Sequence, residues 1–440
     1  MECRRARQHM CVEGGKWPAQ IDAGHTLANL DHLLAKKIDK RIITWDKNGQ
    51  ARIGYGLAGY IRVKDADLYV APKCLHVSEY EEWATGVNMF LALCPNLTSR
   101  DVVMSGSGVF GASNVLLPWW SDYYGRVLRR ALDAMPFFRY EEYAGRIPYI
   151  RGTIDWSSQI REWASCSPRA ACRFRRYQAD NALNRLLKWA ATRFSIIATS
   201  VPTRTKLGSC IDAFASVPDV PPEFAAVERT RIPASHWVYD EPFAIAKSLY
   251  ESLFPTLARG RIPSWGFVVD MVRAFEAFVD GLVRRSVRQG RVGGHDWACR
   301  AQDQELLASA VSGGGGEFYT RPDNVVWAIE SDEGRRGVVI DAKYKGMERS
   351  PKSYRRPVGS DFYQVVVACV SRGWDRALII APTIGDEEAW DELEWAVKMP
   401  GVPRPVHVSI AKVDLKRLSQ RGEVQRNVDR LTTYLGRTLS

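Results

Sequence analysis

The spacing of hydrophobic and polar positions changes twice along the chain. The N-terminal part holds short runs rich in β-branched and aromatic residues, at 42–45, 51–55, 59–63 and 68–73. Turn-type segments with Asp, Asn and Gly separate several of these runs, at 46–49 and 64–67. Short β-type runs bounded by turn residues are typical of strands, so this region predicts a compact β unit.

From about residue 121 the apolar positions recur with a helical period. Helices are predicted at 123–135, 177–197, 241–253 and 267–287, the last of them long and amphipathic. Two segments between them predict loops: 104–114 is rich in Gly and Ser, and 202–222 contains three prolines in its second half.

The last third combines both periods. Two β-type runs at 323–330 and 337–344 flank a polar turn, which predicts an antiparallel hairpin. A helix at 361–372 and strands at 377–381 and 406–412 follow. The three patterns together predict a mixed α/β (α+β) chain in three parts: an N-terminal β-containing domain (1–135), a helical middle region (136–258) and a C-terminal mixed α/β domain (259–440).

The charge balance narrows the function. The 440 residues carry 61 Lys and Arg against 50 Asp and Glu, a net charge of +11 with a pI near 9.2. A basic protein of this size often binds a polyanion such as a nucleic acid. An Arg-rich balance also follows from a GC-rich coding sequence, so charge alone leaves both readings open.

Other features favour a cytoplasmic location. No apolar run approaches the roughly 20 residues that a membrane-spanning helix needs, and no apolar stretch follows the basic N-terminus as in a secretory signal. The nine cysteines are scattered without a Cys-x-x-Cys pair, which fits a reducing compartment and argues against a zinc or disulfide framework. We therefore expect no membrane contact.

Two aspartates and a lysine form the candidate chemistry. Asp341 and Lys343 are two positions apart in a β-type run, so they share one face of the strand. Asp323, after Arg321-Pro322, begins the preceding strand, and a hairpin can place its carboxylate beside Asp341. Carboxylates without histidine suit Mg²⁺ or Mn²⁺. Such a metal with a lysine beside it is the arrangement needed to hydrolyse a phosphodiester.

The Asp-x-Lys triplet is a weak signal by itself. A second one, Asp414-Leu415-Lys416, lies in a polar stretch resembling a helix start, and we interpret it as a solvated face. The alternative for Asp341 is an exposed ion pair with Lys343. The apolar flank at 337–340 argues against it, because it would carry both charges to the end of a buried strand, where they need a functional partner.

The motifs together resemble a known family. Pro322-Asp323, Asp341-Ala342-Lys343 and the helix opening 361–364 (Asp-Phe-Tyr-Gln) resemble the PD-(D/E)xK nuclease superfamily and, more narrowly, McrC, the nuclease subunit of McrBC modified-cytosine restriction systems. The segment 270–278, with Glu276, resembles the leading helix of that family. Weaker likenesses occur at 59–73, 151–155 and 180–185. Residues 1–40 and 200–260 match no motif.

The resemblance implies a role for each matched residue. Asp323 and Asp341 would bind Mg²⁺ or Mn²⁺, Glu276 would complete the acidic shell, and Lys343 would position the attacking water. Gln364 would orient water or contact phosphate, whereas Tyr363 is expected to pack. The basic stretch after Lys343 is the best candidate to line a DNA channel, with Lys345, Arg349, Lys352, Arg355 and Arg356.

The resemblance also implies partners. The C-terminal domain would be a PD-(D/E)xK endonuclease, and domain 1–135 would contact a McrB-like AAA+ GTPase hexamer that recognises and translocates modified DNA. No Walker motif occurs here, so GTP hydrolysis would fall to that partner. Two alternatives remain open: a stand-alone repair or mobile-element nuclease, and a DNA-binding adaptor with a degenerate nuclease site.

Overall fold

The computed structural model places most of the chain. It describes residues 7–18, 31–32, 40–63, 66–74, 87, 90–91, 93–94, 97, 101–105, 117–253, 265–309, 316–329, 336–345, 348–349, 355–356, 359–383, 390, 393–402, 404–420 and 422–439. The chain divides into two compact units. Unit 1 contains Met1–Ser105 and Ile262–Ser440, and unit 2 contains Gly106–Arg261.

The N-terminal sheet of unit 1 has the strand order β1-β5-β4-β10-β6. Its strands are β1 (Arg7–Val12), β4 (Leu57–Val63), β5 (Ala66–Ala71), β6 (Val102–Ser105) and β10 (Trp265–Asp270). Strands β2 (Ile43–Trp45) and β3 (Ala51–Ile53) form a separate pair. The β unit predicted at 42–73 is therefore confirmed. Strand β10 follows unit 2 in the sequence, and it pairs antiparallel with β4 and β6, which precede unit 2.

The second sheet of unit 1 has the order β11-β14-β15-β18-β20-β19. Its strands are β11 (Trp297–Ala301), β14 (Asn324–Ala328), β15 (Gly337–Ala342), β18 (Arg376–Pro382), β19 (Leu393–Val397) and β20 (Val406–Val413). The predicted β14–β15 hairpin is confirmed as antiparallel, whereas β15–β18 and β18–β20 are parallel. Every residue of β15 is buried, as the continuous apolar run of a central strand requires.

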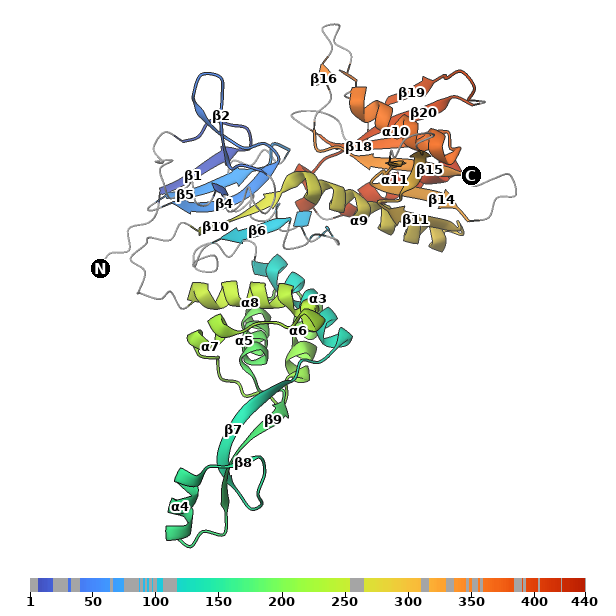
Figure 1. The fold of residues 1–440 in the computed structure, drawn as a ribbon. Helices are drawn as coiled ribbons and strands as arrows, with labels where there is room; N and C mark the ends of the chain where they lie inside the picture. The colour runs from blue at the N-terminus through green and yellow to red at the C-terminus, as the bar shows by residue number, and fades with distance from the viewer. Residues whose placement is uncertain are drawn as a thin grey trace. The chain divides into compact units, whose positions relative to one another are not determined.

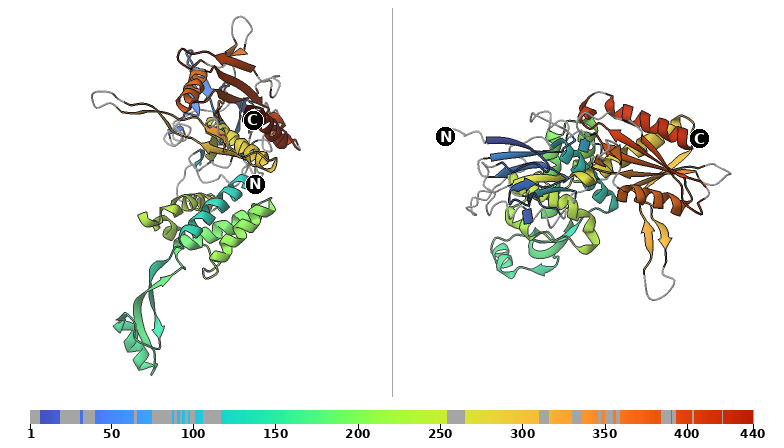
Figure 2. Two further views of the ribbon diagram at one scale, coloured as in Figure 1. Left: turned by 90° about the vertical axis from the view of Figure 1, so that its right-hand side faces the viewer. Right: turned by 90° about the horizontal axis from the view of Figure 1, so that it is seen from above.

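Helices cover both faces of this sheet. Helix α10 (Gly359–Arg372) lies on one face and α11 (Glu423–Leu439) on the other, as the right-hand view of Figure 2 shows. Helix α9 (Met271–Val292) directly follows β10 and packs against α11. A separate hairpin, β12 (Glu305–Ala308) with β13 (Phe318–Thr320), projects away from the sheet in both views of Figure 2.

Unit 2 is a helical bundle with an arm. The bundle contains α3 (Leu117–Ala134), α5 (Ala182–Ile197), α6 (Val201–Ala213), α7 (Phe224–Arg229), η2 (Ala234–Tyr239) and α8 (Asp240–Leu253). The arm is the three-stranded sheet β7 (Arg139–Ile147), β9 (Ala170–Gln178) and β8 (Thr153–Ile154), with α4 (Trp156–Ala164) near its tip (Figure 1). No described helix is long and apolar enough to cross a membrane.

Two predictions for the middle of the chain were wrong. The expected loop at 202–222 begins with helix α6, because Pro202 occupies its first turn, where a missing N–H costs nothing. The region 136–258 is not purely helical, since 139–178 forms the arm. The three expected parts, 1–135, 136–258 and 259–440, also differ from the two observed units, because β10 closes the N-terminal sheet and joins both ends of the chain in unit 1.

The start of β15 offers a test of the packing in unit 1. A methyl group at Gly337 would lie 2.4 Å from the Trp374 ring, far inside van der Waals contact. We expect Gly337→Ala to lower the free energy of unfolding by about 1–3 kcal/mol, as overpacking does. Gly436→Ala is the control, because its methyl group would meet Trp297 at an ordinary 3.9 Å and it lies within α11. The control should be neutral or stabilising. Equal urea unfolding curves for the two variants would contradict the packing described.

Candidate active site

Asp341 and Lys343 lie together at the end of β15. Asp341 is 1% exposed, and its Oδ2 lies 2.6 Å from Lys343 Nζ. The backbone N–H of Lys343 donates to the Ile380 carbonyl of the neighbouring strand β18 at 2.9 Å, which continues the parallel pairing by one residue. The shared face that the sequence predicted for these two residues is therefore observed.

Asp323 stands directly beside them. It precedes β14, whose register pairs Asn324 with Ile340, so the hairpin brings Asp323 to the end of β15. Its Oδ2 accepts a hydrogen bond from the backbone N–H of Ala342 at 2.8 Å. The structure therefore brings the two predicted aspartates together.

Glu276 approaches from helix α9. The helix begins where the sequence changes from strand to helix, at Asp270, whose carboxylate accepts the N–H groups of Val272 and Arg273 at 3.0 and 3.3 Å. These two hydrogen bonds make Asp270 the N-terminal cap of α9. The same carboxylate also pairs with Lys40 at 2.6 Å. Glu276, half-buried one and a half turns later, interacts electrostatically with Lys343, Asp270 and Asp341.

The electrostatics of the site are those of crowded acids. Burial, Asp341 and Glu276 together raise the pKa of Asp323 to about 7. Burial also raises the pKa of Glu276, although Arg273 and Lys343 oppose the shift. Burial lowers the pKa of Lys343, but the neighbouring carboxylates, Asp341 first, outweigh it and the pKa lies above its usual value. Lys343 therefore remains a cation at neutral pH.

These residues suit a hard divalent cation. Within the described residues the sole partner of the Asp341 carboxylate is the Lys343 ammonium, 2.6 Å from Oδ2, and Oδ1 accepts no hydrogen bond there. In the same residues no group of three or more His, Cys, Asp and Glu side chains converges closely enough to form a complete protein cage. Mg²⁺ typically takes one or two carboxylates and fills the rest of its shell with water and phosphate oxygens, so Asp323 and Asp341 fit it. Glu276 would act from a greater distance.

Helix α10 adds Gln364 to the site. Lys343 Nζ donates to Gln364 Oε1 at 3.1 Å, so the predicted glutamine contacts the predicted lysine. One turn earlier Asp361 pairs with Lys345 at 2.8 Å. Tyr363, expected to pack, is 69% exposed, so that expectation was wrong. The helix turns its polar face and Tyr363 outward because Val365 and Val366 occupy the core-facing positions.

The predicted DNA-binding residues are placed only in part. Lys345 is half-buried and paired with Asp361. Arg349 and Arg355 face each other in the short antiparallel pair β16 (Glu348–Arg349) and β17 (Arg355–Arg356), but their side chains and that of Arg356 lie outside the described residues. Lys352 also lies outside them.

Sequence reasoning missed Gln302. Its Nε2 donates to Asp323 Oδ1 at 3.1 Å, and its backbone N–H donates to the Asp323 carbonyl at 2.9 Å. Its φ of 52° is left-handed, which is uncommon outside glycine and often marks a functional constraint. Gln302 also lines a cavity of about 260 Å³ with Asp323, Glu276, Arg273 and Arg321. No local motif marks this residue, because the antiparallel pairing of β11 with β14, in which Ala301 lies opposite Asn324, brings Gln302 beside Asp323 from 21 residues away.

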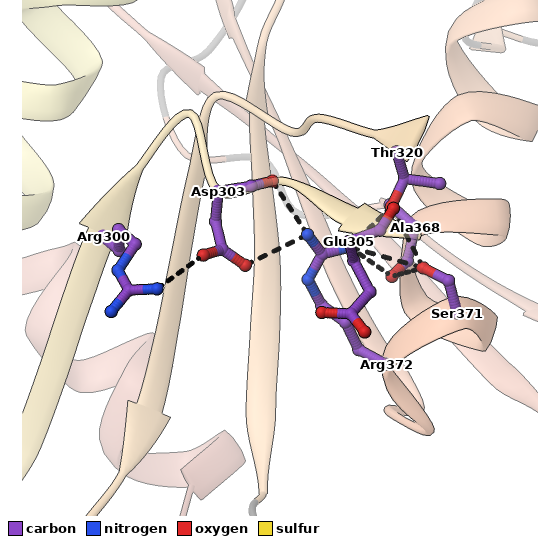
Figure 3. A network of polar contacts seen from close by, with 7 residues as sticks. All are labelled: Arg300, Asp303, Glu305, Thr320, Ala368, Ser371 and Arg372. Atoms are coloured by element: carbon purple, nitrogen blue, oxygen red, sulfur yellow. Dashed lines mark hydrogen bonds and ion pairs between the residues drawn. The ribbon is translucent and has the colours of Figure 1, made fainter. Parts of the chain in front are cut away.

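An arginine fixes the base of that hairpin. Figure 3 shows Arg372, at the end of α10, donating to the side chain of Thr320 at 2.8 Å and to the carbonyl of Asp303 at 2.9 Å. The Asp303 carboxylate accepts from Arg372 and from Arg300, both at 3.1 Å. The two ends of the hairpin, and with them Gln302 and Asp323, are thereby tied to the helix that carries Gln364.

Comparisons with known proteins identify the family of the chain. The family model described as "McrBC 5-methylcytosine restriction system component" matches residues 55–374, more than half of the chain. The chain belongs to this McrBC family. The matched range includes all five predicted catalytic residues: Glu276, Asp323, Asp341, Lys343 and Gln364. No curated protein matches the chain.

Two chains of solved McrBC complexes match this chain to different extents. A chain of the half-complex refined from the tetradecameric assembly of Thermococcus gammatolerans McrB AAA+ hexamers with bound McrC is 16% identical, with a TM-score of 0.54. That match covers 97% of this chain and 99% of that one, so the fold is shared over nearly the whole length. A chain of the cryo-EM structure of the Thermococcus gammatolerans McrBC complex is 17% identical over 64% of this chain and 88% of that one, with a TM-score of 0.33.

The raised pKa of Asp323 gives this McrBC-family chain a testable pH dependence. An acid whose pKa rises from 3.8 to about 7 on folding binds an extra proton in the native state, so it costs stability as pH rises through that window. Without divalent ions, Asp323→Asn should therefore be more stable than wild type at pH 8, by on the order of 1 kcal/mol or more. The gain should vanish near pH 4.

Thermal melts in EDTA from pH 4 to 8.5 measure this difference. Asp429→Asn is the control, because hydrogen bonds from Gln289 and Gln425 lower the pKa of Asp429 and its substitution should give no gain at pH 8. A gain for Asp323→Asn that is equally large at pH 4 would show that the acids of the site do not repel one another.

Proposed function

We propose that this chain is the endonuclease subunit of a McrBC-type restriction (anti-phage defence) complex, with a PD-(D/E)xK domain that cuts modified DNA using Mg²⁺ or Mn²⁺. One observation carries the proposal: Asp341 is 1% exposed beside Asp323, and its only partner among the described residues is the Lys343 ammonium, 2.6 Å from Oδ2. Burial of a carboxylate is costly, and one ammonium serves three neighbouring acids here, Asp341, Asp323 and Glu276, so the site favours a further cation. A DNA-binding adaptor without nuclease activity would gain nothing from these destabilising buried acids.

The order of elements supports the nuclease domain. Helix α9 supplies Glu276, the antiparallel pair β14–β15 supplies Asp323, Asp341 and Lys343, and helix α10 supplies Gln364 before the parallel strand β18. Two carboxylates that can hold a metal, with a lysine beside them, can support metal-assisted phosphodiester hydrolysis.

Each residue then has a defined task in the reaction. A bound Mg²⁺ would supply Lewis-acid stabilisation of the phosphoryl oxygens and lower the pKa of a water ligand. Asp323 and Asp341 would hold it. Lys343, whose raised pKa keeps it protonated, would orient the attacking water and stabilise the developing negative charge; it would not act as the base. Gln364 fixes the Lys343 ammonium by accepting its hydrogen bond.

Substitution of the catalytic residues tests this function. In the presence of DNA, Mg²⁺, GTP and a McrB-like partner, we expect Asp341→Ala and Lys343→Ala to slow cleavage by roughly 10²–10³-fold or more. Lys416→Ala is the control. Lys416 is the lysine of the second Asp-x-Lys triplet, whose Asp414 pairs with Arg417 of the short 3-10 helix Lys416–Ser419. This variant should cut DNA at the wild-type rate. Circular dichroism confirms that each variant is folded. Wild-type cleavage by both site variants would refute the assignment.

The partner contact is proposed on unit 2. The sequence placed it on 1–135, and that prediction is untested. Among the described residues of unit 2, large apolar side chains are exposed along the arm: Tyr140, Tyr149, Ile150, Trp156, Ile160, Trp163 and Tyr177. A hollow of about 390 Å³ lies between several of them near the tip. Exposed aromatic patches of this kind mark protein interaction sites. The similar Thermococcus chain comes from a complex of McrB AAA+ hexamers with bound McrC, so we propose a McrB-like hexamer as the occupant.

Three tryptophans of similar exposure test the partner surface. Trp156 and Trp163 on α4 are 58% and 60% exposed, and Trp237 on η2 is 64% exposed. Trp156→Ala and Trp163→Ala should each weaken binding of the McrB-like partner at least about tenfold and reduce stimulation of its GTPase. Trp237→Ala should bind as wild type. Calorimetry measures the affinities, and equal losses for all three variants would move the interface off the arm.

A further inference from the structure

A buried carboxylate at the start of the chain reaches the candidate site. Glu13 follows strand β1 and is 5% exposed. Its Oε1 accepts the Tyr344 hydroxyl at 2.5 Å and the Lys73 N–H at 2.9 Å, and its Oε2 accepts the Gly56 N–H. Three donors on one buried carboxylate make this a fully satisfied network, which fixes geometry better than an isolated contact does.

One branch of the network ends at Lys343. Tyr344 is the next residue in the chain, so its ring and the Lys343 side chain leave the same short stretch after β15. Three further contacts fix the Tyr344 side chain. Cys74 Sγ lies 3.4 Å from its hydroxyl, and Lys73 Nζ lies 5.0 Å from its ring centroid. The Phe275 ring packs against it at a centroid distance of 5.9 Å. With Tyr344 anchored, the backbone at Lys343 cannot rotate freely.

The other branch ends at Glu276. Gly56 has a φ of 68° and turns its carbonyl toward α9, where it accepts the N–H of Met271, the first residue of that helix, at 2.9 Å. Glu13 holds this turn through the Gly56 N–H. Phe275, beside Glu276 on α9, meets Tyr344 and thereby joins the two branches.

We propose that Glu13 is a positioning residue for the candidate site, acting through Tyr344 on Lys343 and through Gly56 on the helix that carries Glu276. The inference rests on the proposed nuclease function. It means that the N-terminal sheet positions the catalytic groups, although the sheet itself supplies none of them. A displacement near 1 Å of a reacting group can cost about 10²-fold in rate, so the anchoring is large enough to matter.

Removal of one hydroxyl tests the proposal in the full-length protein. Tyr344→Phe deletes the bond to Glu13 and keeps the ring contacts. Tyr60→Phe is the matched control, because the buried Tyr60 hydroxyl donates to the Asp67 carboxylate in the same sheet. Both variants should lose similar thermal stability. Tyr344→Phe should lower kcat for DNA cleavage at least fivefold with KM unchanged, whereas Tyr60→Phe should keep the wild-type kcat.

A second measurement is independent of cleavage. Hydrogen exchange of the segment 341–345, where the Lys343 N–H is bonded to Ile380 and the Lys345 N–H to Lys343, should be faster in Tyr344→Phe than in Tyr60→Phe. Glu13→Gln should give the same acceleration. If Tyr344→Phe and Tyr60→Phe exchange alike, or if kcat is unchanged despite faster exchange, the positioning role is refuted. If wild type exchanges as expected but cuts no DNA, the nuclease function fails and the exchange difference alone supports the anchoring.

Discussion

A buried carboxylate whose only partner among the described residues is one ammonium imposes the strictest constraint on unit 1. Asp341 is the penultimate residue of β15, a strand that is buried along its whole length, so burial of the strand also buries this charge. Lys343 offsets part of the cost, but Asp323 and Glu276 add two more acids to the same region. The acids therefore repel one another, and a divalent cation bound between them would reduce that repulsion and, in the proposed function, would lie where a scissile phosphate needs it.

The surrounding structure keeps those acids from moving apart. The backbone N–H of Ala342 and the side chain of Gln302 hold the two oxygens of Asp323, and the paired strands leave little room for relaxation. Glu13 holds the segment just beyond Lys343. Without these hydrogen bonds the crowded acids would move apart or become protonated. The hydrogen bonds therefore maintain the close spacing of the acids.

The sequence predicted those features of the site that depend on neighbouring residues in the chain. The hairpin, its two aspartates, Lys343 and Gln364 follow from strand alternation, an apolar flank and a matched motif. The expectation that Asp414 lies on a solvated polar stretch was wrong, because Asp414 follows the buried strand β20 and lies between the buried Val413 and Leu415; its carboxylate pairs with Arg417. The other failures were non-local. Nothing near position 13 indicates a partner 331 residues away, and nothing in β10 indicates that it completes the N-terminal sheet.

The division of labour within the chain follows from this connectivity. Unit 2 is inserted in the sequence between the two halves of unit 1, and it carries the exposed aromatic arm, whereas every residue of the candidate site lies in unit 1. The site requires both halves, because Met271, the first residue of α9, donates its N–H to the Gly56 carbonyl and the Tyr344 hydroxyl donates to Glu13. The N-terminal sheet is therefore not a separate module attached to a nuclease domain. It is the part of unit 1 on which the helix and the strand that carry the acids are fixed, and this explains why two sheets with separate cores form one compact unit.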